Sequence, residues 1–300
     1  MRVSLFSAKS DVPLDEHIAD VRAAAAAGMD GMYFGQVSAW DAVTLAAACA
    51  REVPGIDVGV AVTQTFNRHP LVLAGQALTA QALSGNRFTL GVGPSHPMVI
   101  EGMYGIPYER PAQHTREYLQ ALRSLLSGAD TTYRGERITA VGRLAIPGAE
   151  PPSVLLSALG PVMLGLAGEL ADGTATVRTG PKLLAEHIVP IVTRAAERAG
   201  RPAPRIVSAV LVSLTRDPDG VRRQLAEQYA LASNLPAYQA VLERQGMSGV
   251  EETLLAGDEN TIIDGLRAYA DAGATEVMVG TFGDDVHHRR VLELLTMIRP

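Results

Sequence analysis

The chain has 300 residues, of which 47% are hydrophobic and only 19% are charged, so a large share of it must be buried in a core. Its formal net charge is −6 and it contains no run of lysine or arginine, which excludes an electrostatic basis for binding nucleic acid. The single cysteine, Cys49, rules out an intrachain disulfide, and its alanine-rich surroundings predict a buried, inert thiol.

Apolar runs and segments of helical periodicity alternate along the chain. The first helix shows the pattern well, because Leu14, Ile18, Val21 and Ala25 recur every three or four residues before Gly28. The apolar runs predict strands over 3–6, 32–34, 58–63, 87–92, 154–157, 173–177, 206–214 and 276–279. Further helices are predicted over 42–51, 70–83, 115–126, 162–171, 182–199, 219–231, 237–245, 261–272 and 286–298. Residues 93–113 show no clear period, and 128–152 form a polar excursion that predicts a small hairpin.

The predicted strands are apolar without alternation, as strands of a parallel sheet covered on both faces must be. Eight strands, each followed by a helix, predict an α/β fold: a (β/α)8 TIM barrel with insertions, forming one domain over residues 1–300. The rival is a doubly wound dinucleotide-binding sheet, marked by G-x-G-x-x-G after a strand. The matching stretch, Gly91-Val92-Gly93-Pro94-Ser95-His96, lacks the third glycine, and we expect no helix directly after it.

A short turn of small residues, Ser157-Ala158-Leu159-Gly160, joins the fifth predicted strand to a helix that begins at Pro161. Such a turn leaves backbone N–H groups facing outward, and the helix dipole adds partial positive charge there. Together they predict an anion site suited to the phosphate of a cofactor. The alternative is an ordinary connection between a strand and a helix.

The residues at the predicted strand ends lack hydrolytic machinery. The chain has no H-x-H pair to bind a metal, no convincing carboxylate pair at strand tips and no G-x-S-x-G elbow. We therefore expect no metal centre. The remaining glycines, amides, hydroxyls and few imidazoles suit a cofactor that carries the reaction itself.

Four stretches of the chain resemble the luciferase-like family of flavin- and F420-dependent oxidoreductases. They are V-A-V-T-Q-T-F-N-R-H-P at 60–70, Q-A-L-T-A-Q-A-L-S-G-N-R-F-T-L-G-V-G at 76–93, L-S-A-L-G-P at 156–161, and A-G-E-L-A-D-G at 167–173 followed by T-G-P at 179–181. The resemblance implies a barrel of the bacterial luciferase type that binds coenzyme F420, with FMN as the alternative cofactor. It also implies a non-proline cis peptide at Val60-Ala61 or one residue later. The cofactor-binding positions that it implies are Val60, Ala61, Val62, Thr63, Gly91, Gly93, Ser157, Ala158, Leu159, Gly160, Thr179 and Gly180.

Two positions depart from the sugar-phosphate dehydrogenases of this family. Those relatives carry a histidine four residues before a tryptophan, and this chain has Gln36 before Trp40. Gln36 could donate a hydrogen bond to a flavin nitrogen but could not act as an acid. A lysine that holds the sugar phosphate is replaced here by Pro181, which argues against glucose-6-phosphate as substrate.

The resemblance places an acid of the relatives at His96, which we expect to donate or accept a proton, or else to bond to its loop or the cofactor. His96 and Gln36 are the candidate catalytic residues. Trp40 and Arg178 are expected in the substrate pocket, with the barrel rim as the alternative place for Trp40. Arg68 and Arg178 are candidates for binding the anionic tail of F420.

Three hypotheses follow. The first is an F420-dependent oxidoreductase that transfers a hydride between the deazaflavin C5 and a small organic substrate. The second is an FMN- or reduced-flavin-dependent monooxygenase, and the third is a non-catalytic deazaflavin-binding protein. No segment approaches the roughly 18 apolar residues that span a membrane. We expect a cytoplasmic homodimer with a small-molecule substrate and with neither nucleic-acid nor membrane partners.

Overall fold

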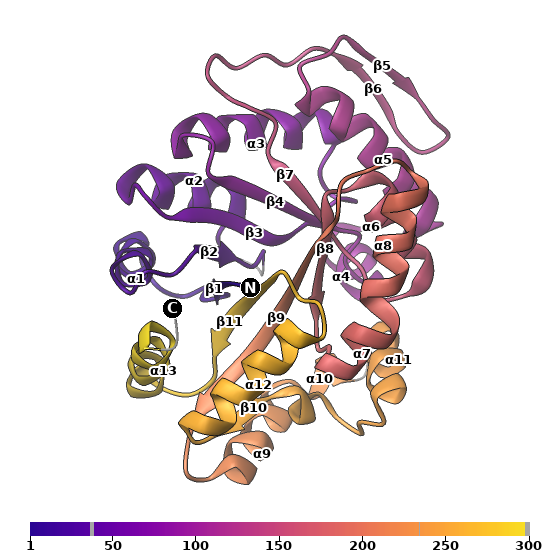
Figure 1. Ribbon diagram of the computed structural model, residues 1–300. Helices are drawn as coiled ribbons and strands as arrows, with labels where there is room; N and C mark the ends of the chain where they lie inside the picture. The colour runs from indigo at the N-terminus through magenta and orange to yellow at the C-terminus, as the bar shows by residue number, and fades with distance from the viewer. Residues whose placement is uncertain (37–38, 234, 298–300) are drawn as a thin grey trace.

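The computed structural model describes residues 1–36, 39–233 and 235–297. Its centre is a closed barrel of eight parallel strands, in which β8 pairs with β9 and β11 pairs with β1 to complete the ring (Figure 1). The predicted TIM barrel is therefore confirmed. In spatial order its strands are β1 (Arg2–Ser7), β2 (Gly31–Phe34), β3 (Asp57–Gln64), β4 (Phe88–Gly93), β7 (Ser153–Ser157), β8 (Gly173–Val177), β9 (Arg205–Leu214) and β11 (Glu276–Thr281).

Helices cover the outside of the barrel, as the periodicity predicted (Figure 1). They include α1 (Leu14–Ala26), α2 (Ala42–Glu52), α3 (Pro70–Ser84), α5 (Pro111–Leu126), α6 (Pro161–Leu170), α12 (Glu259–Asp271) and α13 (Asp285–Met297). Position 298, the last residue of the predicted final helix, lies outside the described residues. None of the helices in the described part of the chain is long and apolar enough to cross a lipid bilayer.

The prediction of one continuous helix over 182–199 is wrong. The structure divides it into α7 (Pro181–Leu183), a π-helical turn η1 (Leu184–Ile188) and α8 (Val189–Arg198). The cause is Pro190, which has no N–H to donate to the preceding turn and whose ring would clash with the carbonyl four residues earlier. A π-turn just before the proline absorbs this clash.

Of the segments inserted between barrel units, some were predicted correctly and others were not. The hairpin of β5 (Thr131–Arg134) and β6 (Thr139–Gly142) confirms the one expected in 128–152. The expectation that no helix follows His96 is wrong, because α4 (Pro97–Tyr104) begins at the next residue. Between β9 and β11 the chain adds α9 (Pro218–Gln228), α10 (Ala230–Ser233), α11 (Pro236–Gln245), the 3-10 helix η2 (Val250–Thr253) and a short strand β10 (Leu255–Gly257) that pairs with β9.

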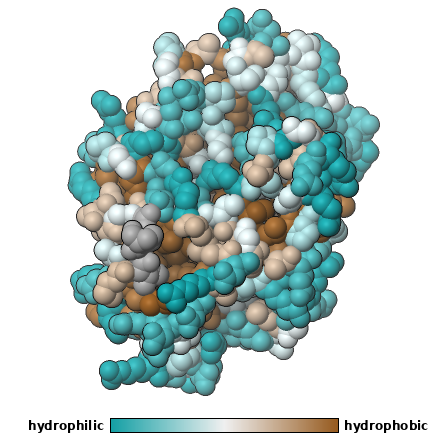
Figure 2. Space-filling view, viewed as in Figure 1, coloured by the Kyte–Doolittle hydropathy of each residue, from teal (hydrophilic) through white to brown (hydrophobic). Residues whose placement is uncertain are grey.

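Hydrophobic residues form a large core between the strands and the helices and a smaller one inside the barrel. The inner core joins side chains of five strands: Tyr33, Leu155, Ala175, Val207 and Met278. The face seen in Figure 2 is mainly hydrophilic, with hydrophobic residues showing in smaller patches. Cys49 lies in the outer core, which confirms that it is buried, and burial raises the pKa of its thiol to about 12.

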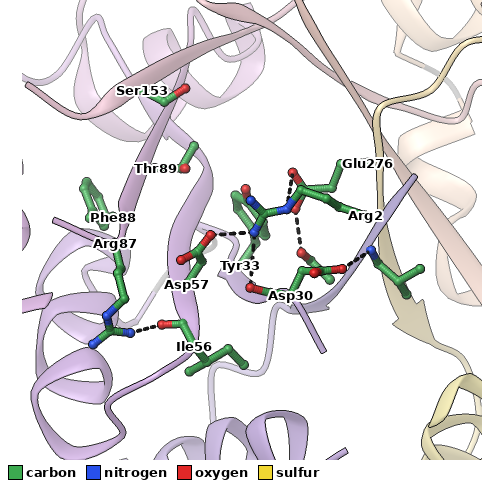
Figure 3. A network of polar contacts seen from close by, with 12 residues as sticks. Arg2, Asp30, Tyr33, Ile56, Asp57, Arg87, Phe88, Thr89, Ser153 and Glu276 are labelled. Carbon is green, nitrogen blue, oxygen red and sulfur yellow. Dashed lines mark hydrogen bonds and ion pairs between the residues drawn. The ribbon is translucent and has the colours of Figure 1, made fainter. Parts of the chain in front are cut away.

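Polar side chains close the end of the barrel where the strands begin. Glu276 of β11 is 1% exposed and accepts a hydrogen bond from the Ser4 hydroxyl. Arg205 donates to a Glu276 carboxylate oxygen at 2.7 Å and to the Tyr33 hydroxyl at 2.9 Å. Figure 3 shows Arg2 beside the same glutamate and bonded to Asp57 at this end. Because this network fills the end at which the strands start, we look for a binding site at the opposite mouth.

Candidate functional site at the barrel mouth

The mouth has an apolar floor. Phe6 of β1, Ala61 and Val62 of β3, and Ala209 of β9 are only partly buried and pack on the inner core. They come from different strands of the closed barrel. An apolar surface inside a barrel mouth suits a ligand with an apolar ring.

The end of β3 carries an unusual concentration of unpaired polar groups. Thr63 Oγ1 and Gln64 Oε1 are buried without a hydrogen-bond partner among the described residues, and so are Asn67 Oδ1 and Arg68 Nη1. Buried polar atoms are rarely left unpaired, so these four atoms are available to pair with a ligand. The bond between Ala61 and Val62 just before them is cis, which confirms the expected cis peptide at the later of the two positions.

Glycines on β4 allow the neighbouring strands to approach closely. A Cβ atom at Gly91 would lie 2.2 Å from the Val60 carbonyl oxygen, where the register between β3 and β4 shifts. At Gly93 it would lie 3.1 Å from Val62 Cγ2 and 3.2 Å from Ser157 Cβ. The glycine at 91 is thus required by contacts within the protein itself. The one at 93 keeps side-chain bulk out of the space between β3 and β7.

The turn after β7 has the properties expected of an anion site. No residue in the described part of the chain accepts a hydrogen bond from the backbone N–H groups of Ala158, Leu159 or Gly160. Gly160 is the N-cap of α6, no side chain caps this helix, and a Cβ atom at Gly160 would meet nothing within 4 Å. Free amides, a helix N-terminus and open space together fit a phosphate group.

Gln36 and Trp40 are held within their own loop. The Gln36 side chain donates to the Trp40 carbonyl at 3.0 Å and accepts from the Ala42 N–H at 3.0 Å, so it caps the start of α2. The Trp40 indole donates to the Val12 carbonyl, and its ring lies edge-on to the His17 ring with centroids 5.6 Å apart. Both residues therefore contribute to the rim between α1 and α2, which was the alternative place for Trp40.

The loop after β8 is fixed by several hydrogen bonds. The Thr179 hydroxyl bonds to the hydroxyls of Thr176 and Ser208, and the Thr179 carbonyl accepts from Tyr269. Gln245 of α11 accepts from the Gly180 N–H and donates to the Arg178 carbonyl. The Gly180 amide is consequently already paired, and Thr179 and Gly180 support the loop from beneath.

Sequence reasoning missed two tyrosines that reach the mouth from the segment after β9. Arg178 lies over the ring of Tyr229, with the guanidinium carbon 4.7 Å from the ring centroid. The Tyr238 ring of α11 meets the His96 ring edge-on, with centroids 5.3 Å apart. Arg178 also lies close enough to Tyr238 for the two to affect each other's pKa. The structure thus brings His96 and Arg178 to one cluster, although no signal in the sequence linked the tyrosines to either residue.

His96 is partly buried at the N-terminus of α4. Burial lowers the pKa of its imidazole below the ordinary value of 6.5, so the ring is mainly neutral at pH 7. A neutral imidazole can accept a proton, which makes His96 a candidate base rather than a candidate cationic acid.

The sequence profile of the luciferase-like monooxygenase family matches residues 2–276. The chain is also 26% identical over 294 residues to 5,10-methylenetetrahydromethanopterin reductase of Methanopyrus kandleri, covering 83% of this chain and 82% of that protein.

Solved structures with the same barrel include flavin and F420 enzymes. The coenzyme F420 dependent tetrahydromethanopterin reductase of Methanopyrus kandleri has a TM-score of 0.82 at 22% identity, covering 99% of this chain and 98% of that chain. An F420-dependent secondary alcohol dehydrogenase bound to an F420-acetone adduct has a TM-score of 0.83 at 16% identity, with 100% and 98% covered. A type II Baeyer-Villiger monooxygenase of Pseudomonas putida in complex with FMN has a TM-score of 0.76 at 18% identity, with 99% and 97% covered. These likenesses establish the shared fold, and the profile match over most of the chain shows that it belongs to the luciferase-like monooxygenase family of oxidoreductases.

Proposed function

We propose that the protein is an F420-dependent oxidoreductase that transfers a hydride between the deazaflavin C5 and a small organic substrate. The observation that carries this proposal is the set of free amides at Ala158, Leu159 and Gly160, at the same mouth as an apolar floor. The F420-dependent reductase and alcohol dehydrogenase of the same fold support the choice of cofactor.

The residues present fit such a cofactor. The amides of the turn after β7 would hold its phosphate, and Ala61 and Val62 would lie under its ring. Thr63 and Gln64, whose side-chain oxygens are unpaired, would bond to the polar edge of that ring. F420, when bound, supplies or accepts the hydride at C5, so the protein contributes position, electrostatics and exclusion of water.

We assign the proton to His96. Removing a hydride from an alcohol or a similar group also releases a proton, and a neutral imidazole at the mouth can accept it. In the reverse direction the same ring returns the proton. Gln36, which bonds to backbone groups of its own loop, takes no part in this assignment.

The second candidate is a monooxygenase that uses FMN or reduced flavin. Its support is the family to which the chain belongs and the FMN complex of the Baeyer-Villiger enzyme. The same turn could bind the phosphate of either cofactor, so the amides do not discriminate between the two.

Titration of the purified protein with F420 and with FMN, followed by absorbance and fluorescence, tests the choice. We expect F420 to bind in the micromolar range and more tightly than FMN. Tighter binding of FMN would favour the monooxygenase, and binding of neither cofactor would refute both. Tight binding of F420 without turnover on any substrate of a broad panel would instead support a non-catalytic deazaflavin-binding protein.

The turn itself is tested by Gly160→Val. Gly160 has an extended backbone and open space around it, so the valine should leave the fold intact while its bulk obstructs the phosphate. We expect F420 affinity to fall roughly tenfold or more, a loss of about 1.4 kcal/mol or more. Gly165→Val on the same helix is the control, since a Cβ atom there also meets nothing within 4 Å. Equal affinities in the two variants would contradict the anion turn.

A further inference from the structure

Arg178 is a buried cation without an anionic partner. It follows β8 directly and is 7% exposed. It forms no ion pair with a carboxylate of any described residue, and its neighbours at the mouth are Tyr229, whose side chain also hydrogen-bonds to it, and Tyr238. Removing a guanidinium from water without an anion is unfavourable, and an aromatic ring compensates only part of that loss.

The backbone at Arg178 is held in an unfavourable conformation. Its φ is 61°, in the left-handed region that side chains other than glycine rarely adopt. Gln245 holds this geometry from α11 by donating to the Arg178 carbonyl at 2.9 Å. Tyr269 secures the next residue by donating to the Thr179 carbonyl, also at 2.9 Å. A cation without a carboxylate partner, held in a strained and fixed backbone, is typical of a functional position, because neither feature stabilises the fold.

The surroundings indicate what the cation binds. Tyr238 contacts both His96, which follows β4, and the neighbourhood of Arg178, which follows β8. The guanidinium and the candidate base therefore belong to one aromatic-walled cluster at the mouth. A ligand anchored on Arg178 by a negative group would have aromatic walls for its apolar part and a base within the same cluster.

We propose that Arg178 is the specificity-determining residue of the substrate site, and that the substrate is an organic anion whose carboxylate or phosphate binds the guanidinium between Tyr229 and Tyr238. This assignment rests on the proposed function, because it takes the side of the mouth with Arg178, Tyr229 and Tyr238 to be the substrate's. A planar guanidinium forms paired hydrogen bonds with either kind of anion. The geometry thereby divides the mouth into a cofactor anion site after β7 and a substrate anion site after β8.

Arg178→Met tests this assignment with two measurements that a structural role would not move together. The probes are benzoate, its uncharged isostere benzamide and inorganic phosphate, titrated by calorimetry into the full-length protein with and without F420. We expect benzoate or phosphate to bind the native protein more tightly than benzamide, and to lose at least tenfold in affinity in the variant. We also expect the Tm of the variant to be equal to or above that of the native protein, because an unpaired buried charge is removed.

The matched control is Arg216→Met, an exposed arginine at the end of β9, which should change neither anion affinity nor Tm. The assignment is overturned if neither anion binds the native protein, or if the variant binds both as tightly as the native protein does. It is overturned also if Arg178→Met weakens F420 as much as it weakens the anions, since Arg178 would then serve the cofactor. Failure of the native protein to bind F420 would refute the proposed function separately, because the anion titrations do not require the cofactor.

Discussion

The sequence identified His96 as a candidate site residue. Its chemical role, however, depends on the residues that surround it in the structure. The resemblance identified the position, but burial at the start of α4 decides that the ring is neutral. His69, in contrast, uses both ring nitrogens within the fold. Its Nδ1 accepts from the Leu71 N–H and its Nε2 donates to the Thr139 carbonyl, so it caps α3 and ties it to the hairpin.

His96→Gln should therefore lower kcat by roughly a hundredfold, since general base catalysis typically contributes that much or more. Because burial lowers the pKa of the His96 imidazole, the pH dependence of kcat can also be predicted. In the native enzyme kcat for oxidation should stay flat through neutral pH and fall only at a pH below the ordinary imidazole value of 6.5, as the ring becomes protonated.

The profile would be measured on a substrate found by screening for F420 reduction, and the imidazole pKa by NMR titration. His69→Asn is the control, because asparagine also caps helices. A variant at His96 that keeps the native profile would assign the proton to another group.

Several residue assignments could not be reached from the sequence. The types of Gln36 and Trp40 are compatible with a ligand pocket, and only the structure shows their bonds to Ala42 and Val12. Tyr229, directly after α9, and Tyr238 of α11 lie more than 50 residues beyond Arg178, in segments whose sequences carry no functional motif. Contacts between such distant segments depend on how the inserted helices fold back over the mouth, which local patterns do not encode.

At the scale of elements, the alternation of apolar and periodic segments was sufficient to predict the barrel. The barrel strands are rich in apolar residues, and this signal is independent of loop geometry. Helix α4 was missed because Ile100 is its only buried side chain, while Met98 and Met103 are exposed. A helix without a regular apolar face gives no periodic signal. Strand β10 has three residues, fewer than any pattern can detect.

Gly165 and Gly168 of α6 allow a test of how closely this helix packs against α8. A Cβ atom at Gly168 would lie 2.2 Å from the Val192 carbonyl oxygen of α8, whereas at Gly165 it would meet nothing within 4 Å. Gly168→Ala should therefore destabilise the protein by about 1–3 kcal/mol through overpacking. Gly165→Ala should stabilise it by roughly 0.5–1 kcal/mol, because alanine favours the helix more than glycine does.

Denaturant unfolding of the two variants measures both free energies. Because α6 presents the anion turn at its N-terminus, Gly168→Ala should also weaken F420 binding, while Gly165→Ala should not. Equal stabilities in the two variants would show that α8 can move away from α6 without loss.

At the scale of the whole molecule, the two ends of the barrel differ in function: one stabilises the fold, and the other carries the proposed binding site. The end where the strands start is filled by the bonded network of Glu276, Arg205 and Tyr33, and the opposite end carries the unpaired side-chain atoms that follow β3 and the free amides that follow β7. Satisfied polar groups stabilise a fold, whereas unsatisfied ones are tolerated where a ligand pairs with them.

Glu276→Gln should lower the stability of the fold without changing the affinity for F420. The variant leaves the Arg205 guanidinium in a largely buried site without its carboxylate, which should cost about 3 kcal/mol of unfolding free energy. The F420 affinity of the folded variant should remain native, because the network lies at the far end of the strands. Asp264→Asn, which removes an exposed ion pair with Arg267, is the control and should change stability by less than about 1 kcal/mol.

Chemical denaturation and F420 titration of both variants supply the two readouts. A native stability for Glu276→Gln would show that water replaces the carboxylate there. A large loss of cofactor affinity at native stability would show that the two ends are coupled through the strands.

The hydrogen bonds of Gln245 with Arg178 and Gly180 join the insertion after β9 to the proposed substrate site. The proposed phosphate turn and ring floor come from strands up to β9, while Gln245, Tyr229 and Tyr238 come from the insertion between β9 and β10. The aromatic walls of the proposed substrate site therefore lie in a separate stretch of the chain from Arg178 and from the proposed cofactor site. We expect related chains that keep Arg178 but differ in this insertion to accept organic anions of different size with the same hydride carrier.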